Sequence, residues 1–401
     1  MREFWLPYGD TELPALIENE ALCKILSIKN LDERSTVQVN LLLKDYIEKL
    51  FSEEKIEETV LIAPKETIQT NLINELISIV KEELFKKGLK KENVNTVYFS
   101  SFEELFSRES VINEETIDET YNSLNAKASF IGETKSGIKF FLNDAIKKAN
   151  TKILIGEAYS SFLFNFLNPY IQAVFGLTNK ETITEILKFI ILNIDSFYNE
   201  AYNTEKLIKE FKSVFSVDLA LTLIPNVKGE PATILLGDLN EVLEKEKEFI
   251  NEYLKVKVEG KPGLIIGSAG GNFFDLNFLK AFPGLKSLSN IIEDEGAIVY
   301  LAECRNGLGF NPKFKKIEEK NDAITIFNYL IQKILVKILT KTKIYLVSSL
   351  PNYYTRELLG FKPYETLNSA LKNVKLNFKN EKNILIVPYA SYTVLELKNN
   401  A

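Results

Sequence analysis

The sequence predicts an α/β protein of two domains with mainly parallel sheets, and three observations support that class. Short runs of aliphatic and β-branched residues alternate along the chain with longer stretches that are apolar at helical spacing. The earlier runs are almost wholly apolar, as strands covered on both faces must be. Strands that alternate with helices are joined by crossover connections, so neighbouring strands are expected to be parallel. A chain of 401 residues is also long for one hydrophobic core.

Eight runs are predicted as strands and five stretches as helices. The strands are expected at residues 58–64, 95–101, 152–158, 218–225, 263–269, 296–303, 343–351 and 383–390. The helices are expected at residues 68–89, 137–149, 180–202, 240–254 and 322–339. The polar helix ending near Lys255 is followed by "VEGKPG", a composition typical of a connector. We therefore predict a first domain at 1–255 and a second at 256–401, with a final strand at 384–397 that could return to the first domain.

The absence of histidine from the whole sequence restricts the chemistry more than any other count. Histidine is the commonest metal ligand and the commonest general acid or base near neutral pH. With one methionine and two distant cysteines, Cys23 and Cys304, soft metal sites are nearly excluded as well. No metal site is therefore predicted, and only a carboxylate site for a hard cation is left open.

Charge and hydropathy give expectations about partners and compartment. The net charge of −6 and the lack of a basic stripe argue against nucleic-acid binding. The most apolar helical stretch, residues 183–194, is too short and too charged to span a bilayer, so no membrane association is expected. Two cysteines do not make a disulfide framework, and the first residues lack the apolar core of a secretion signal. We therefore expect a cytoplasmic protein.

A glycine turn, "GSAGGNFFDLNFLKAFPG", begins at Gly267 where an apolar strand-like run ends. Gly270 and Gly271 lie between that strand and a helix-like stretch, a place where backbone N–H groups can hold an anion. Asp275 could cap or begin the helix. The alternative is a strand-to-helix turn that needs glycine only for its positive φ. The spacing is not G-x-G-x-x-G, so the dinucleotide-binding pattern is absent.

A second segment, "LAECRNGLGF", also follows a predicted strand. Arg305 lies at the carboxyl end of that strand, where ligands of α/β proteins bind, and is a candidate for contacting an anion. Cys304 beside it has two readings, a structural cysteine or a thiol of lowered pKa. A Cys–His nucleophile pair is excluded because the chain has no histidine.

Two further strand ends carry polar residues. Lys65 and Thr67 follow the strand at 58–64 in "IAPKETIQ", and Thr67 is read either as a helix N-cap or as an oxyanion or phosphate contact. Glu157 ends the strand at 152–158, and it is either a solvated loop carboxylate or, if buried, a general base.

The order of several segments resembles nickel-dependent lactate racemases. The opening "LPYGDTELPALI", the stretch "ILIGEAYSSFLFNFLNPYIQAVFGLTNKETI" and the glycine turn occur in the family's order. They are followed by "EDEGAIVYLAECRNGLG", "KIYLVSSLP" and the closing "ILIVPYASYTVLEL". Each motif is weak alone, but together they span nearly the whole chain.

The resemblance implies two Rossmann-like α/β domains with an active site in the cleft between them. It also implies a nickel pincer nucleotide that a lysine tethers, a histidine ligand on the nickel, and two further histidines that exchange the substrate proton. In this sequence the tethering lysine falls near Ile171, and the histidine before the family's glycine-rich segment falls near Ser161. An aliphatic side chain cannot form the tether and no residue supplies an imidazole, so no cofactor is expected.

Carried over position by position, the family's backbone-shaping residues persist. The positions kept, and predicted as cofactor-binding or ligand-binding, are Thr67, Gly270, Gly271, Asp275 and Asn277. The family's glutamine and lysine in the second domain fall near Lys280 and Pro283. The scaffold of a ligand site is therefore predicted without its reacting groups.

Three functions are left open. The first is a lactate racemase-like protein without nickel-pincer racemase activity, which binds a small anion or nucleotide in the cleft or is the partner of an active paralogue. The second is a 2-hydroxy acid or sugar-acid racemase or epimerase with altered catalytic residues. Its candidates are Lys65, Glu157, Lys280 and Arg305, which would have to converge in one cleft. The third is a binding or scaffolding protein unrelated to that cleft, which a filled cleft and a large exposed apolar patch would support.

Overall fold

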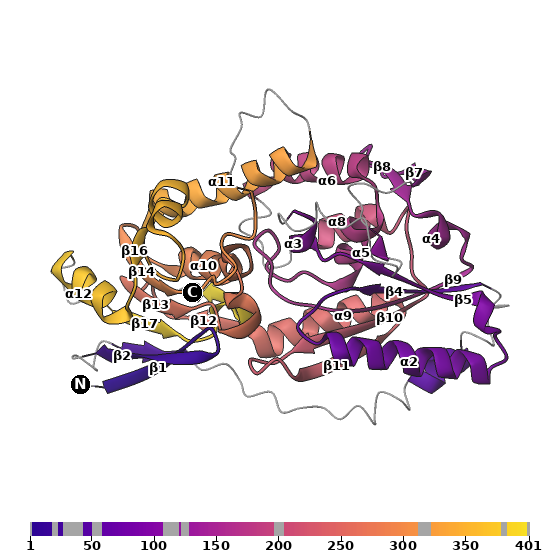
Figure 1. The fold of residues 1–401 in the computed structure, drawn as a ribbon, viewed down its shortest axis with the longest axis horizontal. Helices are drawn as coiled ribbons and strands as arrows, with labels where there is room; N and C mark the ends of the chain where they lie inside the picture. The colour runs from indigo at the N-terminus through magenta and orange to yellow at the C-terminus, as the bar shows by residue number, and fades with distance from the viewer. Residues whose placement is uncertain are drawn as a thin grey trace.

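The computed structural model describes residues 2–17, 23–26, 43–49, 58–106, 120–121, 128–195, 204–311, 322–377 and 383–398. Two six-stranded sheets form the centres of two lobes that lie side by side (Figure 1). All eight predicted strands are present, and the α/β class with mainly parallel sheets is confirmed.

The first sheet is parallel apart from its edge strand β11, which pairs antiparallel with β10. Its order is β11 (Pro231–Gly237), β10 (Leu219–Pro225), β9 (Thr151–Glu157), β4 (Thr59–Pro64), β5 (Val94–Phe99) and β6 (Thr120–Tyr121). One face packs against α2 (Thr70–Lys86) and the helical residues 43–49. The other face packs against α5 (Pro169–Leu177) and α8 (Glu205–Phe211). Side chains of the central strands are buried on both faces because helices cover both.

The second sheet is parallel throughout. Its order is β16 (Lys362–Tyr364), β15 (Thr342–Val347), β14 (Gly296–Leu301), β13 (Leu264–Ser268), β17 (Ile384–Val387) and β3 (Cys23–Ile25). The face turned toward the first domain packs against α10 (Phe278–Ile291) and α11 (Ala323–Lys341). The opposite face packs against α12 (Leu367–Asn377) and an N-terminal hairpin, β1 (Arg2–Tyr8) and β2 (Thr11–Ile17).

The start of the chain therefore belongs with the second sheet, which differs from the predicted first domain of 1–255. β3 pairs with β17, and the hairpin buries Phe4 and Leu6 against the second sheet. Sequence patterns report local periodicity and do not report which distant sheet a strand joins. The predicted final strand at 384–397 is also divided. β17 lies in the second sheet, while β18 (Val394–Leu397) pairs with β12 (Lys255–Val258) at the junction, and neither joins the first sheet.

The predicted helix at 137–149 is wrong in its first half. Residues there form β8 (Lys139–Leu142), which pairs with β7 (Ser129–Glu133), and only then the short α4 (Asp144–Lys148). The Asn143 side chain accepts a hydrogen bond from the Ala145 N–H and so caps the helix at its first residue, Asp144. The predicted helix at 240–254 corresponds to α9 (Leu239–Phe249), which is followed by a π turn (Ile250–Leu254). The predicted helix at 180–202 corresponds to α6 (Lys180–Leu192), and residues 196–202 lie outside the described residues.

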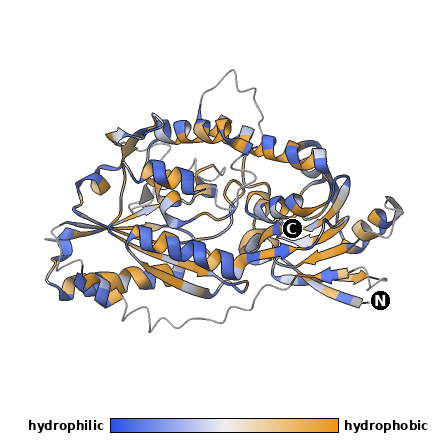
Figure 2. Ribbon diagram, turned by 180° about the vertical axis from the view of Figure 1, so that it is seen from behind, coloured by the Kyte–Doolittle hydropathy of each residue, from blue (hydrophilic) through white to orange (hydrophobic). Residues whose placement is uncertain are grey.

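One helix in the described part of the chain, α11, is long and apolar enough to cross a membrane by length and composition alone. Half of that stretch is buried within the protein, and α11 packs along α6 of the first domain. Hydrophilic and hydrophobic residues alternate along its turns (Figure 2). These are the properties of an amphipathic helix that covers a protein core.

Candidate functional site

An aromatic layer fills the junction between the two domains. Phe106, at the end of α3 (Phe102–Leu105), stacks on Phe327 of α11 with ring centroids 3.9 Å apart and planes at 11°. Phe162, in the loop after β9, stacks on Phe282 of α10 at 6.2 Å and meets Phe327 edge-on at 5.1 Å. These rings are buried, and they belong to one continuous hydrophobic core that includes residues of both domains. Packing of this kind holds the domains together.

A buried polar cluster around Tyr159 lies beside the aromatic layer. The Tyr159 hydroxyl donates a 3.1 Å hydrogen bond to the Glu103 carboxylate, and the Ser161 hydroxyl lies near the same carboxylate. Desolvation by burial raises the pKa of Glu103, although its hydrogen bonds and the charge of Lys280 oppose the shift. The Tyr159 ring meets Phe273 of the second domain edge-on at 5.5 Å. Residues of both domains therefore form this cluster.

Lys280 reaches the cluster from the second domain. Its ammonium lies 4.0 Å from the centre of the Phe273 ring, a cation–π contact, and its charge also acts on Glu104. Burial raises the pKa of Glu104 to about 7. Glu104 also has a structural role, because its carboxylate accepts from the Ser101 N–H in a capping box at the start of α3.

Glu157 is buried at the carboxyl end of β9, so the reading of a solvated loop carboxylate is wrong. Its Oε2 accepts a 2.7 Å hydrogen bond from the Ile68 N–H. Desolvation by burial raises the pKa of Glu157 to about 8, against the hydrogen bonds from the loop at Thr67 and Ile68. The Gln172 amide of α5 donates to the Glu157 backbone carbonyl at 2.6 Å, which fixes the strand end to the helix.

The loop after β4 places Thr67 near Glu157 but does not make it a helix cap. The N-cap of α2 is Gln69, and the Thr67 N–H donates to the Thr70 hydroxyl at 3.0 Å. Lys65 is exposed to solvent, and its backbone N–H donates to the Phe99 carbonyl. The predicted ligand contact of Thr67 stays a prediction.

The glycine turn holds the N-terminal hairpin of the same chain. The buried Asp275 carboxylate accepts a 2.6 Å hydrogen bond from the Gly9 N–H, and the Gly9 carbonyl accepts from the Asn272 N–H at 2.9 Å. Gly271 has a φ of 76°, and a Cβ there would lie 3.0 Å from the Gly9 oxygen. Gly270 has a φ of 117° and lies against Tyr392. Both glycines therefore provide a positive φ, and Gly271 also allows the close approach of the hairpin.

A pocket of about 430 Å³ opens at this turn, between the hairpin and the loop that holds Val227. Its charged lining residues are Asp10 and Glu12. Two carboxylates and no lysine or arginine among the described lining make this pocket unfavourable for an anion. The sequence prediction of an anion at Gly270 and Gly271 thus gains no electrostatic support from the pocket's lining.

The remaining predicted residues lie around the same turn. Arg305 forms a surface ion pair with Asp10 at 3.1 Å, and its Nη1 lies 3.6 Å from Glu303. Cys304 is buried, and burial raises its pKa, so the reading as a thiol of lowered pKa is wrong. Asn277 is the N-cap of α10, because its side chain accepts from the Lys280 N–H at 2.9 Å. Pro283 is buried inside α10.

The four candidate catalytic residues do not converge. Glu157 and Lys280 both lie near Tyr159, since the Glu157 charge acts on Tyr159 and Lys280 acts on its partner Glu103. Arg305 pairs instead with the hairpin at Asp10.

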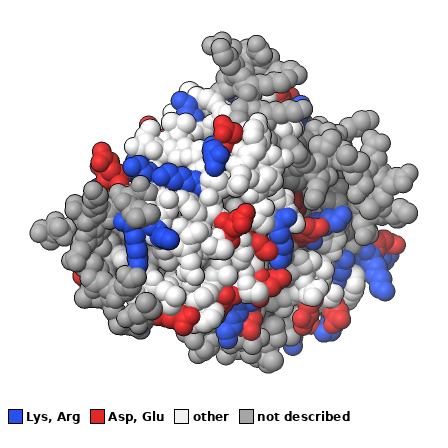
Figure 3. All heavy atoms as spheres, turned by 60° about the vertical axis from the view of Figure 1, so that its left-hand side comes forward, with Lys and Arg blue, Asp and Glu red and all other residues white. Residues whose placement is uncertain are grey.

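On the face of the molecule shown in Figure 3, acidic and basic side chains are interspersed.

Sequence reasoning missed several buried charged residues. Lys286 is fully buried on α10, where its Nζ donates to the Leu163 carbonyl of the first domain at 3.3 Å. Burial lowers the pKa of Lys286 to about 7. Glu246 is buried on α9. Lys286 follows the buried Phe282 by four residues on α10, and Glu246 follows the buried Val242 by four residues on α9. Residues four positions apart share a helix face, so helical spacing in the sequence could have indicated that both charged side chains are buried.

Comparison with known proteins agrees with this architecture. The family described as "Lactate racemase C-terminal domain" matches residues 258–394. A lactate racemase from Thermoanaerobacterium thermosaccharolyticum is 20% identical over 423 aligned positions, which cover 97% of this chain and 98% of the relative. The structure of that organism's lactate racemase apoprotein superposes with a TM-score of 0.76 at 19% identity, over 98% of this chain and all of the other.

A second solved structure, of a protein from Thermotoga maritima, superposes with a TM-score of 0.60 at 12% identity, over 92% of this chain and 99% of the other. The likenesses to solved structures establish the shared fold. Residues 258–394 match the lactate racemase C-terminal domain family, and the full-length alignment with the curated relative makes the chain lactate racemase-like over nearly its whole length.

Proposed function

We propose that this protein is a member of the lactate racemase-like family that does not racemise its ligand through a nickel pincer nucleotide, and that it acts by binding a small organic anion. The observation that carries the first part is the aromatic layer at the domain junction, above all the Phe106–Phe327 stack. In the family the cleft between the domains is the expected active site. Here close-packed rings and a single core occupy the junction.

The residues at the junction do not fit the family's cofactor. Ile171, where the tethering lysine is expected, is wholly buried in the first turn of α5 and has no nucleophilic atom. Ser161, where a histidine is expected, faces Glu103. Within the described ranges no group of three histidine, cysteine, aspartate or glutamate side chains could hold a metal ion, and the full sequence has no histidine. No reaction step is therefore assigned to a nickel cofactor.

An enzyme with altered catalytic residues receives less support. The pair nearest to such a role is Glu157 and Lys280, but Lys280 lies over Phe273 and Glu157 is held by the Ile68 N–H. Neither pocket described for this chain is lined by Tyr159, Glu103 or Glu157.

The test is a lactate racemisation assay with an internal positive control. The protein and the Thermoanaerobacterium lactate racemase are produced by one procedure that yields active racemase, and each is incubated with L-lactate and with D-lactate. We expect the control to interconvert the enantiomers and this protein to leave each unchanged, as measured by chiral chromatography. Racemisation above the protein-free blank, lost on nickel chelation, would refute the proposal.

A further inference from the structure

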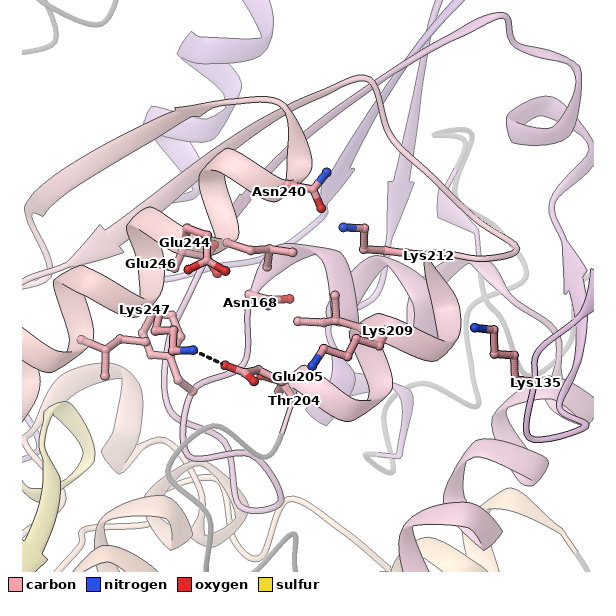
Figure 4. Close-up of a pocket in the computed structure, with 14 residues that line it drawn as sticks. Lys135, Asn168, Thr204, Glu205, Lys209, Lys212, Asn240, Glu244, Glu246 and Lys247 are labelled. Atoms are coloured by element: carbon pink, nitrogen blue, oxygen red, sulfur yellow. Dashed lines mark hydrogen bonds and ion pairs between the residues drawn. The ribbon is translucent and has the colours of Figure 1, made fainter.

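A pocket of about 630 Å³ opens in the first domain between α8, α9 and the loop before α5 (Figure 4). Its volume lies within the range of roughly 300–1,000 Å³ that is typical of small-molecule sites. None of the residues in the polar cluster around Tyr159 lines it. The pocket is therefore separate from the domain junction, and nothing in the racemase resemblance assigns it.

Three lysines without an ion-pair partner in the described part of the chain line this pocket. Lys209 and Lys212 come from the end of α8, and Lys135 comes from the turn between β7 and β8. In Figure 4 the Lys212 ammonium points toward Asn240, the Lys209 ammonium lies next to Glu205, and Lys135 lies apart from both. None of the three ammonium groups has a hydrogen bond or an ion pair with another described residue. Lys247, in contrast, is paired with Glu205 at 2.7 Å. The three lysines therefore present positive charge that the described protein does not neutralise.

Part of the pocket lining is apolar. The apolar residues are Phe166 from the loop before α5, Ile208 from α8, Leu243 from α9 and Ile250 from the π turn after α9. A polar amide, Asn240 at the start of α9, lies across from Lys212 (Figure 4). Apolar surface beside a group of cations suits a ligand that has an anionic head and an apolar body.

The buried Glu246 determines the charge at the base of the pocket. Burial raises the pKa of Glu246 to about 8, against the nearby Thr222 and Asn168 side chains, so the protonated form predominates at pH 7. The negative charge that remains among the lining residues belongs to Glu205, which is paired with Lys247, and to Glu244 on the exposed side of α9. The lysines consequently exceed the ionised carboxylates.

We propose that this pocket binds an organic monocarboxylate with an apolar body. A single negative charge is favoured over a phosphate dianion, because Glu205 and Glu244 would repel a second charge and the described lining offers no arginine to grip a phosphate. This pocket is the site at which the proposed binding of a small organic anion would take place. The physiological role of the pocket rests on the proposed function, but binding of a monocarboxylate there can be measured whether or not the protein racemises lactate.

The experiment is isothermal titration calorimetry of the full chain with octanoate at pH 7. We expect saturable binding with one site per chain. The double variant Lys209→Gln/Lys212→Gln is expected to bind roughly tenfold more weakly, because it removes two charge contacts. The matched control is Lys188→Gln, an exposed lysine of α6 outside the pocket, and it should bind like the parent protein. The variant Leu243→Asn, on the apolar side, should also weaken binding.

Two further probes test the ligand class. 1-Octanol retains the chain without the carboxylate, and inorganic phosphate retains charge without the chain; both should bind far more weakly than octanoate. The inference is overturned if octanoate does not bind, if octanol or phosphate binds equally well, or if the lysine variant binds like the parent. Circular dichroism checks the fold of each variant, and the single variants Lys209→Gln and Lys212→Gln replace the double one if it does not fold. Racemase activity in the assay above would refute the proposed function without affecting this result.

Discussion

Phe106 and Phe327 stack across the domain junction with ring centroids 3.9 Å apart. Phe106 follows α3 of the first domain, whereas Phe327 lies on α11, and the two rings also contact Phe102 of the same layer. Both phenylalanines are buried, so water is excluded from the contact between the two rings. The stack packs the two domains against each other at this point, and the account of this protein depends on it.

Replacing one of these rings should destabilise the whole protein. Phe327→Ala removes a buried aromatic side chain that contacts Phe106, Phe102 and Phe162, so we expect it to lower the free energy of unfolding by about 3–5 kcal/mol. Urea unfolding followed by circular dichroism measures the change. Val336→Ala is the control, because Val336 lies on the same helix with 58% of its surface exposed, and it should shift stability by no more than about 0.5 kcal/mol. Equal effects of the two substitutions would show that the layer does not hold the domains.

Stability should fall as pH rises from about 4.5 to 7. Burial raises the pKa of Glu157 and Glu246 to about 8 and that of Asp275 to about 7, whereas the unfolded chain titrates near the ordinary values. In this pH window the folded state keeps protons that the unfolded state has released. The free energy of unfolding therefore falls by at most about 1.4 kcal/mol per pH unit for each group. Urea midpoints at pH 5.5 and 7.0 test the slope, and Glu246→Gln should flatten it. A midpoint that rises with pH over this range would contradict the prediction.

Above about pH 7, Lys286 should make the free energy of unfolding rise with pH, the opposite of the effect of the buried carboxyl groups. Burial lowers its pKa from 10.5 to about 7, so between these values the unfolded state holds a proton that the folded state lacks, and stability rises with pH. Lys286→Met should remove this rise. It should also increase the free energy of unfolding at pH 6 by about 1–3 kcal/mol, because a buried charge is replaced by an apolar chain of similar length. Lys188→Met, at an exposed position, is the control and should change neither quantity. A pH profile that is the same for Lys286→Met and the parent would exclude this role.

Alanine substitutions at two glycines of similar φ should distinguish the effect of backbone strain from the effect of a steric contact. Gly271 and Gly260 have φ values of 76° and 68°, but only at Gly271 would a Cβ approach another backbone atom, the Gly9 oxygen at 3.0 Å. Gly260→Ala should therefore cost about 1 kcal/mol from φ alone, and Gly271→Ala about 1–2 kcal/mol more as the hairpin shifts. Thermal unfolding measures both, and hydrogen exchange of residues 2–17 should rise only in Gly271→Ala. If the two variants are equally stable, the turn does not clamp the hairpin.

Much of the fold could be predicted because strands and helices are local patterns. The apolar run of β4, buried at all six positions, and the helical spacing of α2 are visible in any short window of sequence. The place of the N-terminal hairpin could not be predicted. It depends on a hydrogen bond between Gly9 and Asp275, which are 266 residues apart, and no local pattern reports such a contact.

The candidate site was predicted less well for the same reason. Glu157 and Lys280 were identified from their positions at a strand end and in a family motif, and both lie near Tyr159. The glycine turn at Gly270 and Gly271 was also located, but its partner is the chain's own hairpin, which composition cannot reveal. The pocket in the first domain is lined by residues of α8, α9, the loop before α5 and the turn at Lys135, which come together only in the folded chain.

The most direct test of the central claim is native mass spectrometry with metal analysis of the protein purified from its own host. The account predicts an intact mass equal to that of the unmodified polypeptide and no stoichiometric nickel. A covalent adduct of nucleotide size together with one nickel ion per chain would contradict it.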